Sequence, residues 1–264
     1  MRYIASCSFG KDSLAMVLML IEKRYPLDEV IFFNTGMEFK AIYNVRDRLV
    51  PILKEHGITY TELEPRKPFL YDMLERPIES KQKGKHNGYG WCGGTCRWGT
   101  TEKLRVIDKY KAGIKDEVYE YVGIAADEAH RAKEKHYPLI DWGITEADCL
   151  AYCWNHGWDW VEKTTATETG YIDLYKILDR CSCWCCSNKN RKELKNIYTF
   201  LPKYWEKLKF LQSRISQPMK KWKNARYGEY GDVFKMEEVF KNERLEEAMA
   251  QQWAGGVNDN NKSE

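Results

Sequence analysis

The chain has 264 residues, 43% hydrophobic and 31% charged, which fits one large α/β domain or a domain with an appendage and excludes a disordered or fibrous protein. Its formal net charge of +3 is too small to establish a nucleic-acid partner. No apolar run approaches the about 18 residues that span a membrane, and no signal-peptide pattern precedes the first predicted strand. We therefore expect a cytoplasmic protein without membrane contact.

The first predicted elements are a strand, a tight polar turn and a helix. Tyr3–Ala5 is apolar, the turn Ser8–Ser13 reads Ser-Phe-Gly-Lys-Asp-Ser, and residues 14–20 form an apolar run. Gly10 lets the backbone approach a ligand, Lys11 adds a positive charge, and a helix N-terminus offers free amides that favour an anion. An ordinary capped turn is the alternative. The combination of residues favours phosphate binding over it.

Short β-rich runs alternate with helical patterns through the first half of the chain. Strands are expected at 31–33, 58–63 and 119–125, and a helix at 40–55, where apolar residues follow helical spacing. This alternation predicts an α/β fold with a doubly wound, mostly parallel sheet. Turns that follow the strands of such a sheet meet at one edge, where ligands bind. These turns are residues 8–13, 34–36 and 127–131.

A loop and then several helices are expected in the later part of the chain. Residues 81–99 are rich in Gly, Lys and Cys and indicate a mobile loop or lid. A helix is expected from Thr145, a capping residue with an acid three positions on, to about His156, and more helices within 191–217 and 236–252. The chain therefore divides into a nucleotide-binding α/β domain with the Cys-rich segments, a helical C-terminal region and a disordered tail. Their expected bounds are 1–186, 187–257 and 258–264.

Nine cysteines are many for a chain in a reducing compartment, where metal ligation is more common than disulfides. Cys92 and Cys96 form one pair, and Cys183-Trp184-Cys185-Cys186 contains a second, about ninety residues later. Together they can supply four thiolates to zinc or an iron–sulfur cluster, with buried structural thiols as the alternative. Spacing alone does not fix the ligands among Cys181, Cys183, Cys185 and Cys186. Cys149 and Cys153, on one helix face, are expected in the core.

A basic and aromatic stretch lies near the C-terminal end. Residues 220–227 mix lysines and an arginine with Trp222 and Tyr227, a pattern that suits a polynucleotide backbone with stacked bases. Together with Lys81, Lys83 and Lys85 this stretch could form a basic path towards the site. An ordinary surface of long cationic side chains is the alternative.

The turn Ser8-x-Gly10-x-Asp12-Ser13 resembles the PP-loop of the adenine-nucleotide alpha-hydrolase superfamily. Three later stretches, in family order, resemble the phosphoadenosine phosphosulfate (PAPS) reductase family of that superfamily, and the resemblance covers residues 1–215. Two positions depart from the pattern, with Asn34 in place of Asp and Ala125 in place of Arg. The three stretches are residues 34–39, 123–131 and 137–142.

The resemblance implies a site for ATP, PAPS or adenosine phosphosulfate (APS). Lys11, Asp12 and Arg131 would be catalytic, with Asp12 helping to hold Mg²⁺ and Arg131 and Lys103 steadying phosphate charge. A solvated salt-bridge cluster is the alternative for the acidic and basic residues of 127–131. Relatives hold a 4Fe–4S cluster with similarly placed cysteines, which implies Cys92, Cys96, Cys183 and Cys186 here, with zinc as the alternative. The implied nucleotide contacts are Ser8, Phe9, Gly10, Lys11, Asp12, Ser13, Asn34, Thr35, Gly36, Lys103, Gly123, Asp127, Glu128 and Arg131.

We expect an ATP pyrophosphatase that transfers adenylate and is linked to sulfur transfer from a sulfur donor, with a nucleic acid (tRNA or DNA) or a small molecule as acceptor. A sulfonucleotide reductase that uses a thiol reductant is the second hypothesis, but the chain has no Cys after Cys186 to match the family's C-terminal nucleophile. A nucleotide-binding module without catalysis is the third. The sequence leaves open the acceptor, ATP against PAPS or APS, and a homodimer.

Overall fold

The computed structural model describes residues 1–81, 84–92, 94–220 and 231–256, and within them a four-stranded parallel sheet has the order β3-β2-β1-β6. Ala5 of β1 lies opposite Val30 of β2 and Tyr121 of β6, which sets the register of the central strand. The expected α/β fold with a parallel sheet is confirmed. The strands are β1 Arg2–Ser6, β2 Glu29–Phe33, β3 Thr59–Leu63 and β6 Val118–Val122.

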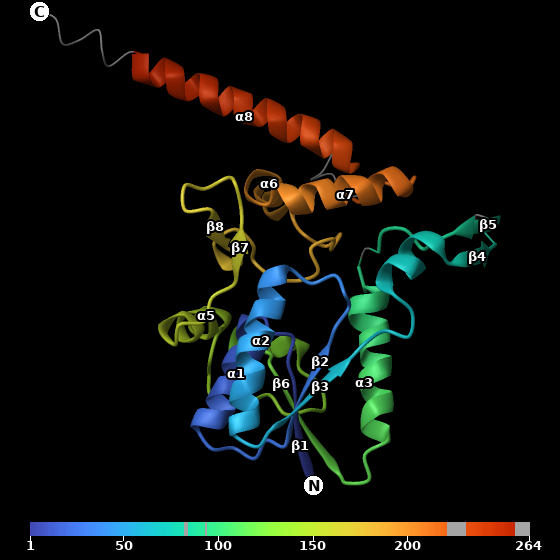
Figure 1. The fold of residues 1–264 in the computed structure, drawn as a ribbon, viewed down its shortest axis with the longest axis vertical. Coiled ribbons are helices and arrows are strands. Elements are labelled where there is room, and N and C mark those ends of the chain that lie inside the picture. The colour runs from blue at the N-terminus through green and yellow to red at the C-terminus, as the bar shows by residue number, and fades with distance from the viewer. Residues whose placement is uncertain (82–83, 93, 221–230, 257–264) are drawn as a thin grey trace, which may run out of the picture.

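Helices cover both faces of the sheet (Figure 1). Alternate residues of a strand point to opposite faces, so Ala5 and Phe32 pack under α1 (Lys11–Glu22) and α2 (Lys40–Glu55). Ile4 and Ile31 point the other way, into a smaller cluster with Ile107 of α3 (Lys103–Ala112). The helix expected at 40–55 is confirmed at those residues. Because the four strands are parallel, their carboxyl ends lie at one edge of the sheet.

The strand expected at 119–125 ends three residues early, at Val122. A Cβ atom on Gly123 would lie 2.8 Å from the Cα of Ser13, so the chain passes directly against the turn after β1. That close approach takes the chain out of the sheet. A second difference is that residues 84–87, expected in a loop, form β5 (Gly84–Asn87), which pairs antiparallel with β4 (Pro77–Ser80).

Shorter elements connect the sheet to the C-terminal part. The helix expected from Thr145 is α5 (Glu146–Asn155), and Thr145 and Asp148 form the expected capping interaction. β7 (Val161–Lys163) pairs with β8 (Tyr171–Asp173). The remaining short elements are π-helical turns at Tyr71–Glu75 and Arg97–Glu102, 3₁₀ turns at Ala126–Arg131 and Leu174–Lys176, and α4 (Pro138–Asp141).

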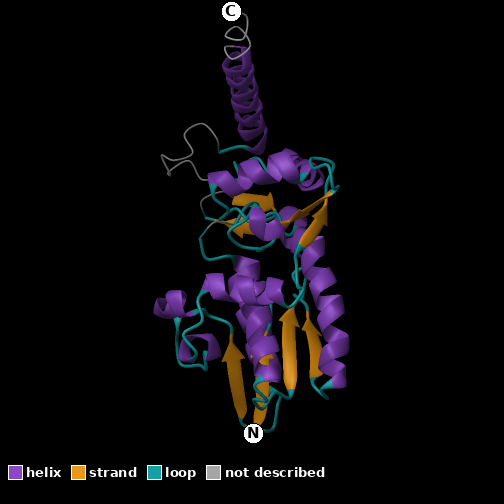
Figure 2. Cartoon of the chain, turned by 90° about the vertical axis from the view of Figure 1, so that its left-hand side faces the viewer, coloured by secondary structure: helices purple, strands orange, loops and turns teal. Residues whose placement is uncertain are grey.

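The expected C-terminal helices are present as α6 (Arg191–Phe200), α7 (Pro202–Arg214) and α8 (Val233–Gly256). Trp205 of α7 packs with Phe240 of α8, while the far end of α8 extends away from the remainder of the molecule (Figure 2). Among the described residues, no helix is both long and apolar enough to span a membrane. The expected tail at 258–264 lies outside the described residues.

Candidate functional site

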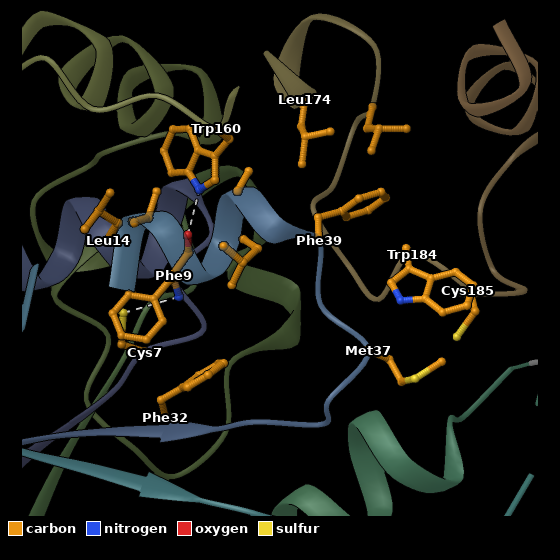
Figure 3. Packing of buried hydrophobic residues seen from close by; sticks show 14 of the residues in the cluster. Cys7, Phe9, Leu14, Phe32, Met37, Phe39, Trp160, Leu174, Trp184 and Cys185 are labelled. Carbon is orange, nitrogen blue, oxygen red and sulfur yellow. Dashed lines mark hydrogen bonds between the residues drawn. The ribbon is translucent and has the colours of Figure 1, made fainter. Parts of the chain in front are cut away.

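The turn between β1 and α1, residues 8–13, holds Phe9 in the left-handed region, with a φ of 57°. Residues other than Gly adopt this conformation at a cost, so neighbouring contacts must hold it. The Phe9 ring is fully buried and meets Phe32 edge-on at 4.9 Å between ring centres. Its carbonyl accepts a hydrogen bond of 2.7 Å from Nε1 of Trp160 (Figure 3). The Phe9 side chain therefore supports the turn from the core side and does not line the cavity described below.

The turn presents free amides above Phe9. The backbone amides of Gly10, Asp12 and Ser13 have no acceptor within the described ranges. Ser13 Oγ accepts a hydrogen bond from the Ser8 amide at 3.1 Å and lies 3.1 Å from Ser8 Oγ, which closes the turn. Unpaired amides at a helix N-terminus form an anion site.

A cavity of about 380 Å³ opens beside this turn. Its walls come from the turn, from the start of α3, from β6 and the loop after it, and from the segment 175–182. Of the expected nucleotide contacts, Phe9, Asn34, Thr35, Gly36 and Asp127 do not line it. The expected contacts that do are Ser8, Gly10, Lys11, Asp12, Ser13, Lys103, Gly123, Glu128 and Arg131.

The side chain of Lys11 is buried and is held by two acidic residues. Its Nζ donates to Asp12 at 2.9 Å and to Glu146 of α5 at 2.8 Å. Burial by itself would lower the pKa of Lys11, but these two hydrogen bonds outweigh it and raise the pKa. Burial raises the pKa of Asp12. Lys11 is thus a fixed cation between two carboxylates, and these two hydrogen bonds leave the third N–H of its ammonium group for a further acceptor.

Lys103, at the start of α3, is a cation in the cavity wall that has neither hydrogen bond nor ion pair with any residue in the described part of the chain. Burial lowers the pKa of its ammonium group, and the negative charge of Glu38 opposes that effect. Lys103 is half-buried, and a partly desolvated ammonium without a hydrogen-bond partner favours an anion in the cavity.

The arginines of the cavity share acidic partners. Arg131 and Arg180 both pair with Glu128, and Arg180 also lies 3.8 Å from Glu146. Arg131 is therefore both a cavity residue and a member of the salt-bridge cluster that was the alternative for this segment. Asp127 instead accepts a hydrogen bond from the amide of Glu146 at 3.1 Å, which ties the 3₁₀ turn to α5.

The second predicted nucleotide motif, Asn34–Gly36, forms hydrogen bonds within its own turn and with nearby residues of the chain. Asn34 Oδ1 accepts hydrogen bonds from the Gly36 amide at 2.8 Å and the Tyr43 hydroxyl at 2.9 Å. Thr35 Oγ1 donates to Glu38 at 2.7 Å and lies 3.5 Å from Cys183 Sγ. This turn therefore lies beside the cysteine segment rather than in the cavity.

The structure brings the two cysteine segments together. Asn188 donates to the Gly94 carbonyl at 2.9 Å and accepts from the Gly94 amide at 3.0 Å, and Ser187 Oγ donates to the Cys92 carbonyl. No three Cys, His, Asp or Glu side chains in the described ranges are placed to hold a common metal ion. The four-thiolate ligand set therefore stays a prediction, supported by the soft donors on two joined loops.

The individual thiols differ in their surroundings. Cys183 Sγ lies 3.8 Å from Glu38 Oε1, and burial raises the pKa of both Cys183 and Cys185. Lys220 donates to the Ser187 carbonyl at 2.5 Å, and burial lowers its pKa to about 8. Lys189, also buried, donates to Ser182 at 3.1 Å. These cations would favour thiolates in the segment.

The remaining thiols divide between core and cavity. Cys149 and Cys153 are fully buried, as expected for core residues. Cys7 is also buried, and burial raises its pKa to about 11, which is typical of an unreactive thiol at a strand end. Cys181, in contrast, lines the cavity.

Sequence reasoning missed several cavity residues. The hydroxyl of Tyr175 accepts a hydrogen bond from the Lys11 amide at 2.8 Å, and Glu146 and Arg180 complete the charged wall. Tyr175 lies 164 residues from Lys11, and no local pattern marks it. Glu146 follows a recognisable cap, but the cap predicts only that a helix begins there.

The expected basic path is described only in part. Lys83 and residues 221–227 lie outside the described residues, whereas Lys81 and Lys85 belong to the β4–β5 hairpin region. At the base of that hairpin, the guanidinium group of Arg97 stacks 3.8 Å from the ring centre of Tyr89, and that of Arg76 lies at 5.6 Å.

Comparisons with known proteins show three similarities. Residues 2–67 match the phosphoadenosine phosphosulfate reductase domain, which confirms the resemblance for β1 to β3. An uncharacterized protein of Methanocaldococcus jannaschii is 28% identical over 207 residues, and the match spans 76% of this chain but only 39% of that protein's length. The U34-tRNA thiolase NcsA from Methanococcus maripaludis, solved with its 4Fe–4S cluster, has a TM-score of 0.42 and 16% identity, over 61% of this chain and 58% of that one.

Proposed function

Because residues 2–67 belong to the phosphoadenosine phosphosulfate reductase domain family, we propose that the cavity binds an adenine nucleotide, ATP in the first instance, and activates an acceptor by adenylyl transfer. The observation that carries the proposal is the meeting of unpaired turn amides with the unpartnered Lys103 in one cavity. Both groups need an anion, and the phosphates of a nucleotide supply it.

The chain's own residues have separate tasks in this reaction. The free amides of Gly10, Asp12 and Ser13 hold the phosphates, while Lys103 and Arg131 neutralise the charge that builds on them. An acceptor oxygen attacks the α-phosphorus, the bond from that phosphorus to the bridging oxygen breaks, and pyrophosphate leaves with the electron pair. Asp12 would hold Mg²⁺, which screens phosphate charge when bound.

The cysteine segments link this chemistry to sulfur. Once the acceptor carries adenylate, a sulfur donor attacks the activated carbon and AMP leaves. Cys92, Cys96, Cys183 and Cys186 would hold a 4Fe–4S cluster, or zinc, and a bound cluster would carry or orient the sulfur. The acceptor would be a nucleic acid, tRNA or DNA, since Tyr89 with Arg76 and Arg97 offers a ring and cations suited to stacked bases and phosphates.

A sulfonucleotide reductase is the second candidate because Cys181 lines the same cavity. Its thiolate would attack the sulfur of PAPS or APS, release the nucleotide, and leave a thiosulfonate from which a thiol reductant frees sulfite. Burial raises the pKa of Cys181 to about 12, so the thiol is protonated at neutral pH. A protonated thiol is a poor nucleophile, which favours adenylyl transfer over this reaction.

The two reactions leave different products. With ATP, Mg²⁺ and a tRNA pool under anaerobic conditions, adenylyl transfer predicts pyrophosphate release, whereas the reductase predicts sulfite release from PAPS or APS with thioredoxin. Lys103→Met should weaken ATP binding by at least about tenfold, since a charged hydrogen bond contributes about 1.5–3 kcal/mol. Lys109→Met, on the same helix but exposed, is the control. Tight ATP binding without turnover on tRNA, DNA or a small acceptor would indicate a non-catalytic module.

A further inference from the structure

The cavity wall carries apolar as well as charged side chains. The apolar ones come from α3, from β6 and from the loop after β6. They are Leu104, Ile107, Val122 and Ile124. A nucleoside needs apolar contact for its base, so a nucleotide with phosphates on the turn would place its nucleoside against these residues.

One buried carboxylate of the cavity wall comes from the sheet. Glu120, in the middle of β6, is buried and lines the cavity together with Ser6 of β1. Its Oε1 accepts a hydrogen bond from Ser6 at 3.0 Å, and its Oε2 accepts from Lys111 at 2.6 Å and Lys135 at 2.9 Å. Each carboxylate oxygen can accept about two hydrogen bonds, so Oε1 retains acceptor capacity.

Glu120 lines the same cavity as the phosphate-binding turn. Ser6, its hydrogen-bond partner, is the last residue of β1 and precedes Ser8 of that turn by two residues. A buried carboxylate is a good acceptor for a ribose hydroxyl, as in dinucleotide-binding folds.

The charges around Glu120 leave no excess for a further phosphate. Lys111 pairs with Asp108 at 3.0 Å as well as with Glu120, so the two lysines are matched by two carboxylates. A phosphate on the 3′ position would bring its negative charge against Glu120.

We propose that Glu120 is a specificity-determining residue that accepts a hydrogen bond from a ribose hydroxyl of the bound nucleotide, so that the cavity takes nucleotides with free 2′ and 3′ hydroxyls and disfavours those with a 3′-phosphate. This inference rests on the proposed function and extends it, because it selects ATP or APS over PAPS.

Isothermal titration of the full chain with ATP, 2′-deoxy-ATP, 3′-deoxy-ATP, APS and PAPS, which carries a 3′-phosphate, tests this. Wild-type protein should lose at least about tenfold in affinity for one of the deoxy analogues, the loss expected for a hydrogen bond to a charged group. It should also bind PAPS more weakly than APS. Glu120→Gln should bind ATP and that deoxy analogue within a few-fold of each other, while Glu117→Gln, exposed just before β6, should discriminate as wild type does.

The wild-type titrations need no variant, so they can overturn the role of Glu120 even if Glu120→Gln does not fold. Equal affinity for ATP and both deoxy analogues, or tighter binding of PAPS than APS, would overturn the role of Glu120 while leaving the proposed function standing. Absence of binding to every nucleotide would remove the proposed function itself, and the role of Glu120 with it.

Discussion

At the scale of single residues, Phe9 and Trp160 connect the core to the phosphate-binding turn. The left-handed conformation of Phe9 persists because its ring is buried and its carbonyl has a hydrogen-bond donor in Trp160. Both contacts lie beneath the turn, so they fix its shape without occupying the cavity. A ligand that binds there meets a preformed backbone.

Trp160→Phe should remove that donor and leave the buried carbonyl of Phe9 unsatisfied. The expected loss is about 1–3 kcal/mol in the free energy of unfolding, measured by urea denaturation. Trp154→Phe is the matched control, because its Nε1 bonds to Asp173 at 3.1 Å but the side chain is partly exposed. An equal effect of the two substitutions would contradict this account of Phe9.

The ionisation of Glu120 predicts how the free energy of unfolding changes with pH. Burial alone would raise the pKa of Glu120, but hydrogen bonds from Lys111 and Lys135 outweigh it and lower the pKa. The folded state then binds fewer protons than the unfolded state, whose Glu pKa is about 4.3. The stabilisation is complete above that pH and is lost as the pH falls through the native pKa. Acidification should therefore cost wild-type protein more free energy of unfolding than Glu120→Gln, and parallel pH profiles would contradict this.

At the scale of elements, caps and close approaches fix where helices and strands begin and end. The Thr145 cap can be read from sequence because its partner lies three residues away. The end of β6 at Val122 could not be predicted, because it depends on contact between Gly123 and Ser13, 110 positions apart in sequence. The free amides of residues 8–13 could be predicted, because the strand, turn and helix that create them are adjacent in sequence. Tyr175 and Arg180 could not be predicted as cavity residues, because only the tertiary fold brings them there.

The start of α6 shows a cap of the same kind. Asn190 Oδ1 accepts a hydrogen bond from the Glu193 amide at 2.9 Å, and Glu193 accepts from the Asn190 amide at 2.9 Å. Asn190→Ala should lower the free energy of unfolding by about 0.5–2 kcal/mol. Asn44→Ala, at an exposed position within α2, is the control for chemical denaturation. A loss no greater than that of the control would show that the cap does not stabilise α6.

At the scale of the whole molecule, segments distant in sequence form each functional part. The cavity draws on residues 6–13, 103–107, 120–146 and 175–182, and the cysteine segments meet through Asn188 and Gly94. Sequence spacing predicted candidate thiols for a metal centre, but it could not predict which of these side chains point towards one metal ion or cluster. Cys183 illustrates the limit, because its neighbours Thr35 and Glu38 lie about 150 residues earlier.

Asn188→Ala should separate the two cysteine segments. Wild-type protein purified without oxygen should contain iron with acid-labile sulfide, or zinc, and the variant should contain less per chain by elemental analysis. Asn44→Ala should retain the wild-type content. Wild-type protein without iron, zinc or sulfide would remove the basis for the metal centre and leave the nucleotide site untouched.

The central claim is that the turn between β1 and α1 holds nucleotide phosphates. A crystal structure of the full chain with Mg²⁺ and a non-hydrolysable ATP analogue tests it most directly. The account predicts phosphate oxygens within hydrogen-bond distance of the amides of Gly10, Asp12 and Ser13 and near the ammonium group of Lys103. Phosphates bound elsewhere, or a cavity without nucleotide at saturating concentration, would contradict it.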